Sequence, residues 1–190
     1  DPAALARMTA GRELAGAYLI ESFVHAPDAA RLFASIAAAS RPGAVLVICD
    51  DFAAFPAGAV RGRTVRADRP RGEYSSRTAR LVREFRWGWH VNTFVSADEA
   101  AELARRAGWE RLQTVDLSRS VVTTRPRDLL ARLFAYPARL FRARSPRWQN
   151  VIGGSALQRL IRSGAVRYQL LVFALSGSAA TSPGVGPGVS

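Results

Sequence analysis

The hydrophobic pattern of the first quarter of the chain predicts a strand, a helix and a second strand in succession. Residues 17–24 form a short apolar run that is typical of a buried strand. Asp28 is a good N-cap for the helix that follows, in which apolar residues recur at helical spacing. Residues 41–43 (Arg-Pro-Gly) interrupt this helix, and residues 44–49 are apolar throughout. Two continuously apolar strands around a helix indicate a βαβ unit in a parallel sheet.

The best-marked helix begins after Ser96. Ser96 and Glu99 have the spacing of a capping box, apolar residues then follow on one face, and Gly108 ends the helix. Further helices are expected at 76–86, at 126–141 with a break at Pro137, and after Gly153-Gly154-Ser155 to about Gly164. Further strands are expected at 112–117 and 166–175.

Length and composition indicate a globular domain, or a large piece of one. The chain has 190 residues, 48% of them hydrophobic, and a mean hydropathy near zero. No apolar run reaches the roughly 20 residues that span a bilayer, and the first residues show no signal-peptide pattern. We expect a structured portion over 1–175, followed by a flexible Gly-, Ser- and Pro-rich tail over 176–190.

Cysteine and histidine usage limits the metal and disulfide chemistry that the chain can support. Cys49 is the single cysteine, which excludes an internal disulfide and a cysteine-based zinc cluster. Two histidines remain as metal ligands, so we expect no metal centre. This cysteine usage fits a reducing, cytoplasmic location.

The charge is strongly basic and unevenly distributed. The net charge is +12, all 27 basic residues are arginines, and residues 129–190 contain eight arginines and no acid. Such a charge fits nucleic acid, an anionic membrane surface, an acidic protein partner or a solvated surface. Nucleic-acid binding is the least favoured, because only Trp87, Trp89 and Trp148 offer stacking platforms near arginines. The basic helical segment at about 126–148 fits peripheral membrane contact, a cover over an apolar pocket, or packing on the sheet.

Chemically reactive side chains follow both strands of the βαβ unit. Glu21, Ser22 and His25 follow the first strand, and Asp50 and Asp51 end the second. Because parallel strands end at the same edge of a sheet, where ligands bind, these residues are expected along one rim. They fit a general base, or carboxylates that bind hydroxyl groups or a cationic ligand. They also fit structural roles, with Asp50 capping a turn and His25 forming a structural hydrogen bond.

Three segments together resemble the C-terminal half of class I S-adenosylmethionine-dependent methyltransferases, in the group of sterol-, tocopherol- and ubiquinone-type enzymes that act on small molecules. Residues 18–52 (YLIESFVHAPDAARLFASIAAASRPGAVLVICDDF) resemble that family's fourth strand, helix, "RPGG" turn and fifth strand. Residues 94–118 (FVSADEAAELARRAGWERLQTVDLS) resemble its next helix, turn and sixth strand. Residues 150–175 (NVIGGSALQRLIRSGAVRYQLLVFAL) resemble its last helix and closing strand. The resemblance implies an α/β, Rossmann-like sheet that is mostly parallel with an antiparallel last strand and helices on both faces.

The family's Gly-rich cofactor loop and the acidic residue that holds the ribose have no counterpart in the sequence, which contains no G-x-G-x-x-G pattern. The chain therefore resembles the family from the fourth strand onward. A fragment, part of a longer polypeptide and a subunit of a split enzyme all remain open. In each case a complementary N-terminal segment or partner chain is expected to supply the first three strands, since a half sheet exposes an edge and an apolar face. A homo-oligomer is a further alternative.

The resemblance also implies roles for individual residues. S-adenosyl-L-methionine is the implied cofactor, with Ile20, Glu21 and Ser22 along its methionine end. His25 matches a histidine that faces the substrate or orders the loop around it. Asp51 and Phe52 match the substrate entrance.

Trp87, Trp89 and His90 lie in the variable insert, about 53–95, that forms a substrate lid in relatives. His25 or His90 is the candidate base for O-methylation. Glu21 is the candidate for stabilising positive charge in C-methylation.

The leading hypothesis is a methyltransferase that acts on a small, apolar or natural-product-type acceptor. The alternative is a non-catalytic, methyltransferase-like subunit that binds and stabilises a partner protein. The absent cofactor loop favours the alternative, and the presence of Glu21 and His25 favours catalysis.

Overall fold

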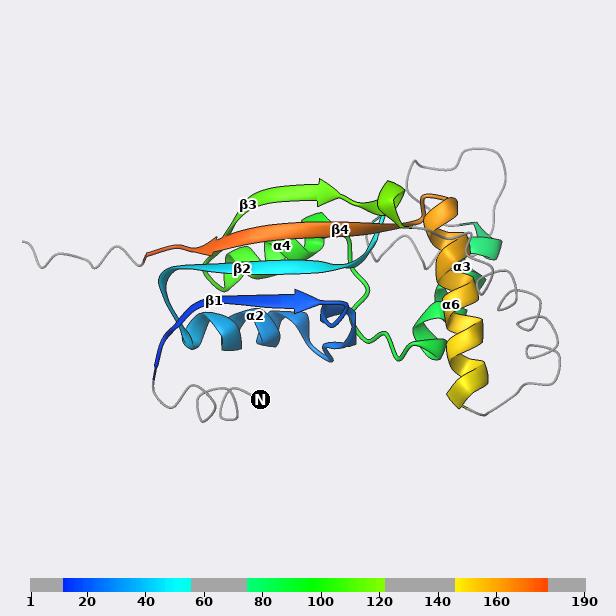
Figure 1. Cartoon of the computed structure of the whole chain (residues 1–190), viewed down its shortest axis with the longest axis horizontal. Coiled ribbons are helices and arrows are strands. Elements are labelled where there is room, and N and C mark those ends of the chain that lie inside the picture. Colours follow the sequence, from blue (N-terminus) through cyan, green and yellow to red (C-terminus); the bar gives the residue numbers. More distant parts are fainter. Residues whose placement is uncertain (1–11, 56–74, 122–145, 178–190) are drawn as a thin grey trace, which may run out of the picture.

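The computed structural model describes residues 12–55, 75–121 and 146–177. Within these ranges the chain alternates strands and helices in an α/β arrangement (Figure 1). The elements are β1 (Leu14–Ile20), η1 (Phe23–His25), α2 (Ala29–Ala38), β2 (Ser40–Ala53), α3 (Ser76–Gly88), α4 (Ala97–Arg106), β3 (Trp109–Asp116), η3 (Ser118–Ser120), α6 (Pro146–Arg162) and β4 (Val166–Leu175).

The strands form one mixed sheet with the order β1-β2-β4-β3. β1 and β2 are parallel, whereas β4 is antiparallel to both of its neighbours, β2 and β3. β1, β2 and β3 therefore run in one direction, and the last strand runs against them between β2 and β3. This confirms the predicted α/β sheet with an antiparallel last strand.

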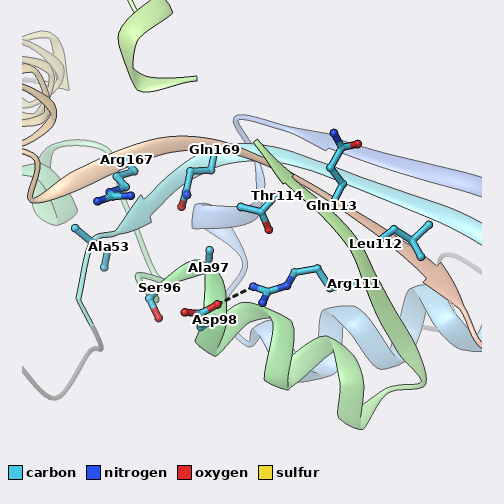
Figure 2. Close-up of a pocket in the computed structure, with 11 residues that line it drawn as sticks. Ala53, Ser96, Ala97, Asp98, Arg111, Leu112, Gln113, Thr114, Arg167 and Gln169 are labelled. Atoms are coloured by element: carbon cyan, nitrogen blue, oxygen red, sulfur yellow. Dashed lines mark hydrogen bonds and ion pairs between the residues drawn. The ribbon is translucent and has the colours of Figure 1, made fainter. Parts of the chain in front are cut away.

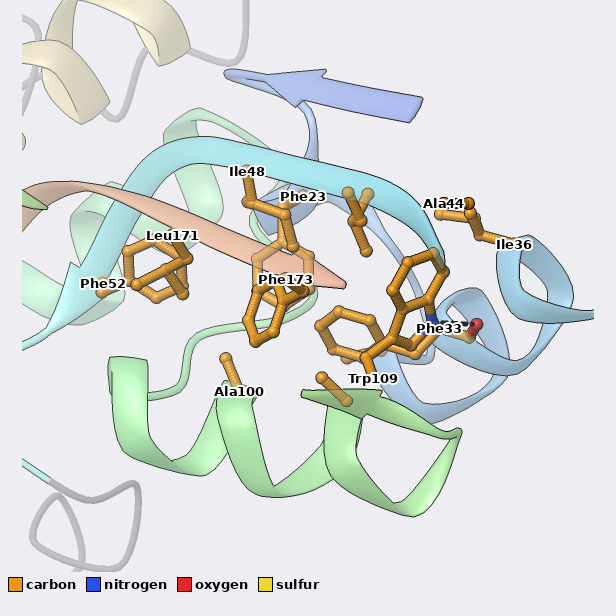
Figure 3. Close-up of a cluster of buried hydrophobic side chains, with 13 residues drawn as sticks. Phe23, Phe33, Ile36, Ala44, Ile48, Phe52, Ala100, Trp109, Leu171 and Phe173 are labelled. Atoms are coloured by element: carbon orange, nitrogen blue, oxygen red, sulfur yellow. Dashed lines mark hydrogen bonds between the residues drawn. The ribbon is translucent and has the colours of Figure 1, made fainter. Parts of the chain in front are cut away.

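Helices α2 and α4 cover the same face of the sheet (Figure 1). The core beneath them is rich in aromatic rings, with Phe33 of α2 packed edge-on against Phe173 of β4 at 5.9 Å (Figure 3). The Trp109 indole is 1% exposed, and its Nε1–H donates to the Phe33 carbonyl oxygen at 3.2 Å. A fully buried large apolar side chain contributes about 2 kcal/mol to stability. These rings therefore hold both helices firmly against the sheet.

The predicted helix starts are confirmed by their hydrogen bonds. The Asp28 carboxylate accepts the Arg31 backbone N–H at the start of α2. At the start of α4, Ser96 Oγ accepts the Glu99 N–H, and the Glu99 carboxylate accepts the Ser96 N–H in return. The helix that is expected over 76–86 is α3, and the strand over 166–175 is β4.

Three predicted boundaries were wrong. The first strand ends at Ile20 rather than at residue 24, because the backbone turns at Glu21, whose φ is 49°. Residues 41–43 lie within β2 rather than in a break before it, and the strand expected at 112–117 begins earlier, at Trp109.

The fourth correction concerns Gly153-Gly154, which lie inside α6 instead of before it. A Cβ on Gly153 would lie 2.6 Å from Trp89 Cδ1 and 3.0 Å from the Gly88 backbone. The α6 helix therefore crosses the end of α3 so closely that a side chain at residue 153 does not fit. Glycine is unfavourable in a helix interior, so this close approach explains its presence there.

The opposite face of the sheet carries exposed apolar side chains. Tyr18 is 76% exposed, Ile20 60% and Val45 39%. Of the helices expected on both faces, the described residues show the α2–α4 layer on one face, while α3 and α6 pack together beyond the end of the sheet (Figure 1). β1 is an edge strand of the described sheet, with β2 as its one neighbour.

Several expectations lie outside the described residues. They include residues 56–74 of the substrate-lid insert, residues 126–145 of the basic segment and residues 178–190 of the tail. Among the described helices none has both the length and the apolar composition that a bilayer crossing requires.

The α3–α6 crossing generates a prediction for two adjacent glycines. Gly153→Ala would place a Cβ against backbone and is expected to lower the free energy of unfolding by about 1–3 kcal/mol. Gly154→Ala is the matched control, because its Cβ would lie 3.6 Å from the Trp89 ring, an ordinary contact. That variant is expected to gain up to about 1 kcal/mol from helix propensity. Urea unfolding of both variants measures the difference, and equal stability would contradict the close crossing.

Candidate functional site

The carboxyl ends of β1 and β2 meet at one rim of the sheet. The last paired residues are Ile20 and Cys49, and the Glu21 N–H donates to the Cys49 carbonyl oxygen at 3.0 Å. This hydrogen bond fixes Glu21 beside β2 just before its two aspartates. Ile20, Glu21 and Ser22 are all exposed. The rim expected from the sequence therefore exists, and it is open to a ligand at the end of β1.

Asp50 anchors the turn that follows β1. Its Oδ2 accepts the Val24 N–H at 3.2 Å, and its Oδ1 accepts the Asp51 N–H at 2.8 Å. Burial raises the pKa of Asp50, and its backbone hydrogen bonds and the nearby His25 oppose that effect. Because both carboxylate oxygens are hydrogen-bonded, Asp50 holds η1 against β2.

Asp51 lies in a different environment. Side chains alternate along a strand, so Asp51 faces the same side of the sheet as Cys49, opposite to the Asp50 side. Asp51 is 8% exposed, and among the described residues its Oδ1 has no hydrogen-bond partner. Burial first, and then the neighbouring carboxylates of Asp50 and Glu21, raise the pKa of Asp51 to about 7. This pKa suits a group that exchanges protons near neutral pH.

Tyr168 completes the group of polar side chains, and the sequence analysis missed it. It lies directly opposite Asp51 in the β2–β4 ladder. Its hydroxyl lies 3.5 Å from Glu21 Oε1. Burial and the neighbouring Cys49, Glu21 and Asp51 raise the pKa of Tyr168, so its phenol stays protonated. The strand itself was predicted, but its register against β2 has no signature in the sequence.

The ring of His25 lies near the backbone of His90. His25 Nδ1 lies 3.4 Å from the His90 carbonyl oxygen. The Asn92 side-chain amide donates to the His25 carbonyl oxygen at 2.9 Å, and Thr93 Oγ1 donates to the Ala26 carbonyl oxygen at 2.6 Å. These bonds dock the segment after α3 onto η1. These bonds hold His25 next to the backbone of residue 90, and His25 is exposed to solvent.

The aromatic candidates lie in several environments. Phe52 is fully buried, and its ring packs 5.8 Å from that of Phe23 in the core. Trp89 packs 6.0 Å from the Phe85 ring, and its Nε1–H donates to the Asn150 carbonyl oxygen at 3.3 Å, which ties α3 to α6. Trp87 is 47% exposed. The roles of these residues in substrate binding remain predictions.

An apolar groove of about 790 Å³ lies between β1 and α2. We call it the β1–α2 groove. Ser22 and His25 lie at its rim end, and its walls are mostly apolar. The residues that line it are Leu14, Ala17, Leu19, Ser22, His25, Ala26, Pro27, Asp28, Arg31, Leu32, Ser35 and Ile36.

A second, polar pocket of about 380 Å³ lies between β3, β4 and the start of α4 (Figure 2). Arg111 reaches from β3 to Asp98, with Nη1 2.7 Å from Oδ1. Arg167 lies 3.5 Å from Asp116. Each arginine is already paired with an aspartate, so this pocket offers an anion no uncompensated charge.

The environment of Asp51 generates a prediction about stability and pH. The pKa of Asp51 is raised from 3.8 to about 7 in the folded state. The unfolded chain therefore loses this proton first as pH rises, which lowers the free energy of unfolding by up to about 4 kcal/mol between pH 4 and 8. Asp51→Asn removes this penalty, so the variant is expected to be more stable than the parent chain at pH 8 and similar at pH 4.

Asp116→Asn is the control of opposite sign. Hydrogen bonds from Ser118, and the nearby Arg167, lower the pKa of Asp116, so this carboxylate contributes stability that is lost as pH falls. Its replacement is expected to reduce stability at pH 8. Urea unfolding across this pH range tests both variants, and a loss of stability at pH 8 in Asp51→Asn would show that Asp51 is not strained by its surroundings.

Comparisons with known proteins identify the fold of the described residues. No protein-family model and no curated protein matches the sequence. A Galdieria sulphuraria protein described as a sarcosine dimethylglycine methyltransferase is 18% identical, with a TM-score of 0.56 over 87% of this chain and 54% of its own. The cyclopropane synthase MmaA2 from Mycobacterium tuberculosis is 15% identical, with a TM-score of 0.58 over 86% of this chain and 56% of its own.

A third match is the geranyl diphosphate C-methyltransferase from Streptomyces coelicolor, whose structure contains Mg²⁺, geranyl diphosphate and S-adenosyl-L-homocysteine. It is 16% identical, with a TM-score of 0.52 over 86% of this chain and 49% of its own. The chain thus spans about half the length of the solved structures it matches. At these identities the likeness establishes the fold. The described residues have the fold of the C-terminal half of S-adenosylmethionine-dependent methyltransferases, as the sequence resemblance predicted.

Proposed function

We propose that the chain forms the C-terminal half of an S-adenosylmethionine-dependent methyltransferase that acts on a small-molecule acceptor. The observation that carries the proposal is the rim at the ends of β1 and β2, where Glu21 and Asp51 lie close together in a methyltransferase-like sheet. Ligands of open α/β sheets bind beyond the carboxyl ends of the strands. The solved match that methylates geranyl diphosphate supports a small-molecule acceptor.

The residues at the end of β1 fit the cofactor. S-adenosylmethionine supplies an electrophilic methyl group on a positively charged sulfonium. Ile20 offers an exposed apolar side chain, and Glu21 an exposed carboxylate that complements positive charge. Together with Ser22, these residues would hold the methionine end of the cofactor. The parts of the fold that hold its adenosine are not among the described residues.

The side chains of the rim then have distinct roles. Asp51 accepts a proton, since its pKa is near neutral and its Oδ1 is free. Glu21 stabilises positive charge, and the Tyr168 hydroxyl orients its carboxylate. His25 remains a candidate base for an acceptor that enters from the side of the β1–α2 groove.

We further propose that a complementary polypeptide, upstream or separate, adds parallel strands beside β1. Three observations support it: the chain spans half of its structural matches, β1 is an edge strand of the described sheet, and its Tyr18 and Ile20 are largely exposed. Edge pairing would satisfy the free backbone groups of β1. A helix from the same polypeptide would fill the β1–α2 groove.

A second candidate function is a non-catalytic subunit that stabilises such a partner. The observation in its favour is that the sequence contains no Gly-rich cofactor loop. In that case the exposed β1 edge and the β1–α2 groove bind the partner, and the rim carboxylates have no catalytic role.

Calorimetric titration with S-adenosylmethionine separates the two candidates. The chain alone is expected to bind it weakly or not at all, because the described residues supply one end of the site. The chain together with its complementary upstream or partner segment is expected to bind the cofactor, with Glu21→Gln weakening binding by about tenfold. Glu110→Gln, an exposed position on β3, is the matched control and is expected to bind as the parent does.

A stable complex that does not bind the cofactor would favour the non-catalytic subunit. Equal binding by the chain alone and by the complex would contradict the half-site.

A further inference from the structure

A group of carboxylates without arginine partners lies at the rim of a very basic protein. The chain carries a net charge of +12. Among the described residues, no ion pair joins Glu21, Asp50 or Asp51 to an arginine. Three acids on α4 and β3 do pair with arginines, namely Asp98, Glu102 and Asp116. Each carboxylate that has no positive partner makes it harder for the neighbouring carboxyl groups to ionise, because like charges repel. Such an arrangement lowers stability and favours the binding of a cation.

The most informative atom of this group is Asp51 Oδ1. Asp51 is 92% buried as a residue, and its Oδ1 has no hydrogen-bond partner in the part of the chain that the structure describes. A buried carboxylate oxygen without a hydrogen-bond donor lowers the stability of the folded state. Asp50 next to it has both oxygens satisfied. The unsatisfied oxygen is therefore specific to the residue that faces away from the core.

Three neighbouring side chains surround Asp51, and they come from β2, from β4 and from the end of β1. Glu21 follows β1, Cys49 shares β2 with Asp51, and Tyr168 lies opposite on β4. Tyr168 is 3.5 Å from Glu21 through its hydroxyl, and Glu21 is exposed. The group thus has a solvent-accessible carboxylate at its entrance and an unsatisfied one inside.

The chemistry of these groups selects the ligand. An ammonium group carries one positive charge and several N–H donors, so it can interact with both carboxylates, offset one of their charges and donate to Asp51 Oδ1. An anion would be repelled, and a hydroxyl group would leave the charges uncompensated. We propose that Glu21, Asp51 and Tyr168 form a binding site for the ammonium group of an amine acceptor, with Asp51 Oδ1 accepting one of its N–H bonds.

The site has a defined pH dependence. Glu21, Cys49 and Tyr168 lie on the Asp51 side of the sheet. Asp50 points to the other side but still acts on Asp51 through its charge, and His25 lies near Asp50. With a pKa of about 7, Asp51 is mostly protonated below neutral pH and then carries no charge for an ammonium group. Binding of a permanently protonated amine therefore strengthens as pH rises through 7.

The identity of the amine as the methyl acceptor rests on the proposed function, but its binding does not. If the complex binds S-adenosylmethionine but the chain does not bind amines, the amine site is wrong and the proposed function stands. If the chain binds amines but the complex never binds the cofactor, the amine site stands and the proposed function is wrong.

The test compares benzylammonium with benzyl alcohol, which share a ring and differ in the charged group. Both are titrated into the full chain without cofactor, and chemical-shift changes in ¹H–¹⁵N spectra give the affinities. Benzylammonium is expected to bind at least about tenfold more tightly than benzyl alcohol, with shifts at residues 21, 51 and 168. Its affinity is expected to rise by several-fold between pH 6 and 8.

Variants locate the charge that is recognised. Asp51→Asn and Glu21→Gln are expected to weaken benzylammonium binding by about tenfold each and to leave benzyl alcohol unchanged. Tyr168→Phe is expected to have a smaller effect, since the ring remains. Glu110→Gln, on β3, is the matched control and is expected to bind normally.

Folding is checked independently, because the spectra of each variant report its structure. Equal binding of the two probes, binding that is unchanged in both carboxylate variants, or affinity that does not change with pH would each overturn the proposal. Displacement of benzylammonium by Mg²⁺ at equal concentration would also overturn it, because the carboxylates would then form a metal site.

Discussion

The parallel pairing of β1 with β2 is the interaction on which the site depends. It ends both strands at one rim, and the hydrogen bond from the Glu21 N–H to the Cys49 carbonyl oxygen fixes the register there. Two chain segments separated by α2 thereby place Glu21 near Asp51. The antiparallel β4 then adds Tyr168 opposite Asp51. The site is thus a consequence of strand direction and register, and its side chains are carried by hydrogen-bonded strands and the turn after β1.

The sequence predicted the elements well where the pattern is local. Asp28 and the Ser96–Glu99 capping box act through neighbours three residues away, and both are confirmed. Features that depend on distant contacts were missed. Gly153 was predicted to lie before a helix, since glycine is unfavourable inside one. It lies inside α6 because α3 approaches it closely at Gly88. Tyr168 was missed for the same reason, since its position opposite Asp51 depends on register.

The two adjacent aspartates show how burial and hydrogen bonding separate structural from functional side chains. The sequence could place Asp50 and Asp51 at a strand end but could not distinguish them. Asp50 is satisfied by two backbone N–H groups and anchors a turn. Asp51 faces the other side of the sheet with an unsatisfied oxygen and a pKa near neutral. A fold that retains such a residue accepts lower stability, which is typical of sites that bind or react.

We propose that the rim of β1 and β2 is one half of a methyl-transfer site that a complementary polypeptide completes. A crystal structure of the chain with that polypeptide and S-adenosyl-L-homocysteine would test this arrangement. We expect an additional parallel strand paired with β1, and the sulfur of the ligand beside Ile20, Glu21 and Ser22. A ligand bound away from this rim, or a β1 edge that stays unpaired in the complex, would rule the half-site out.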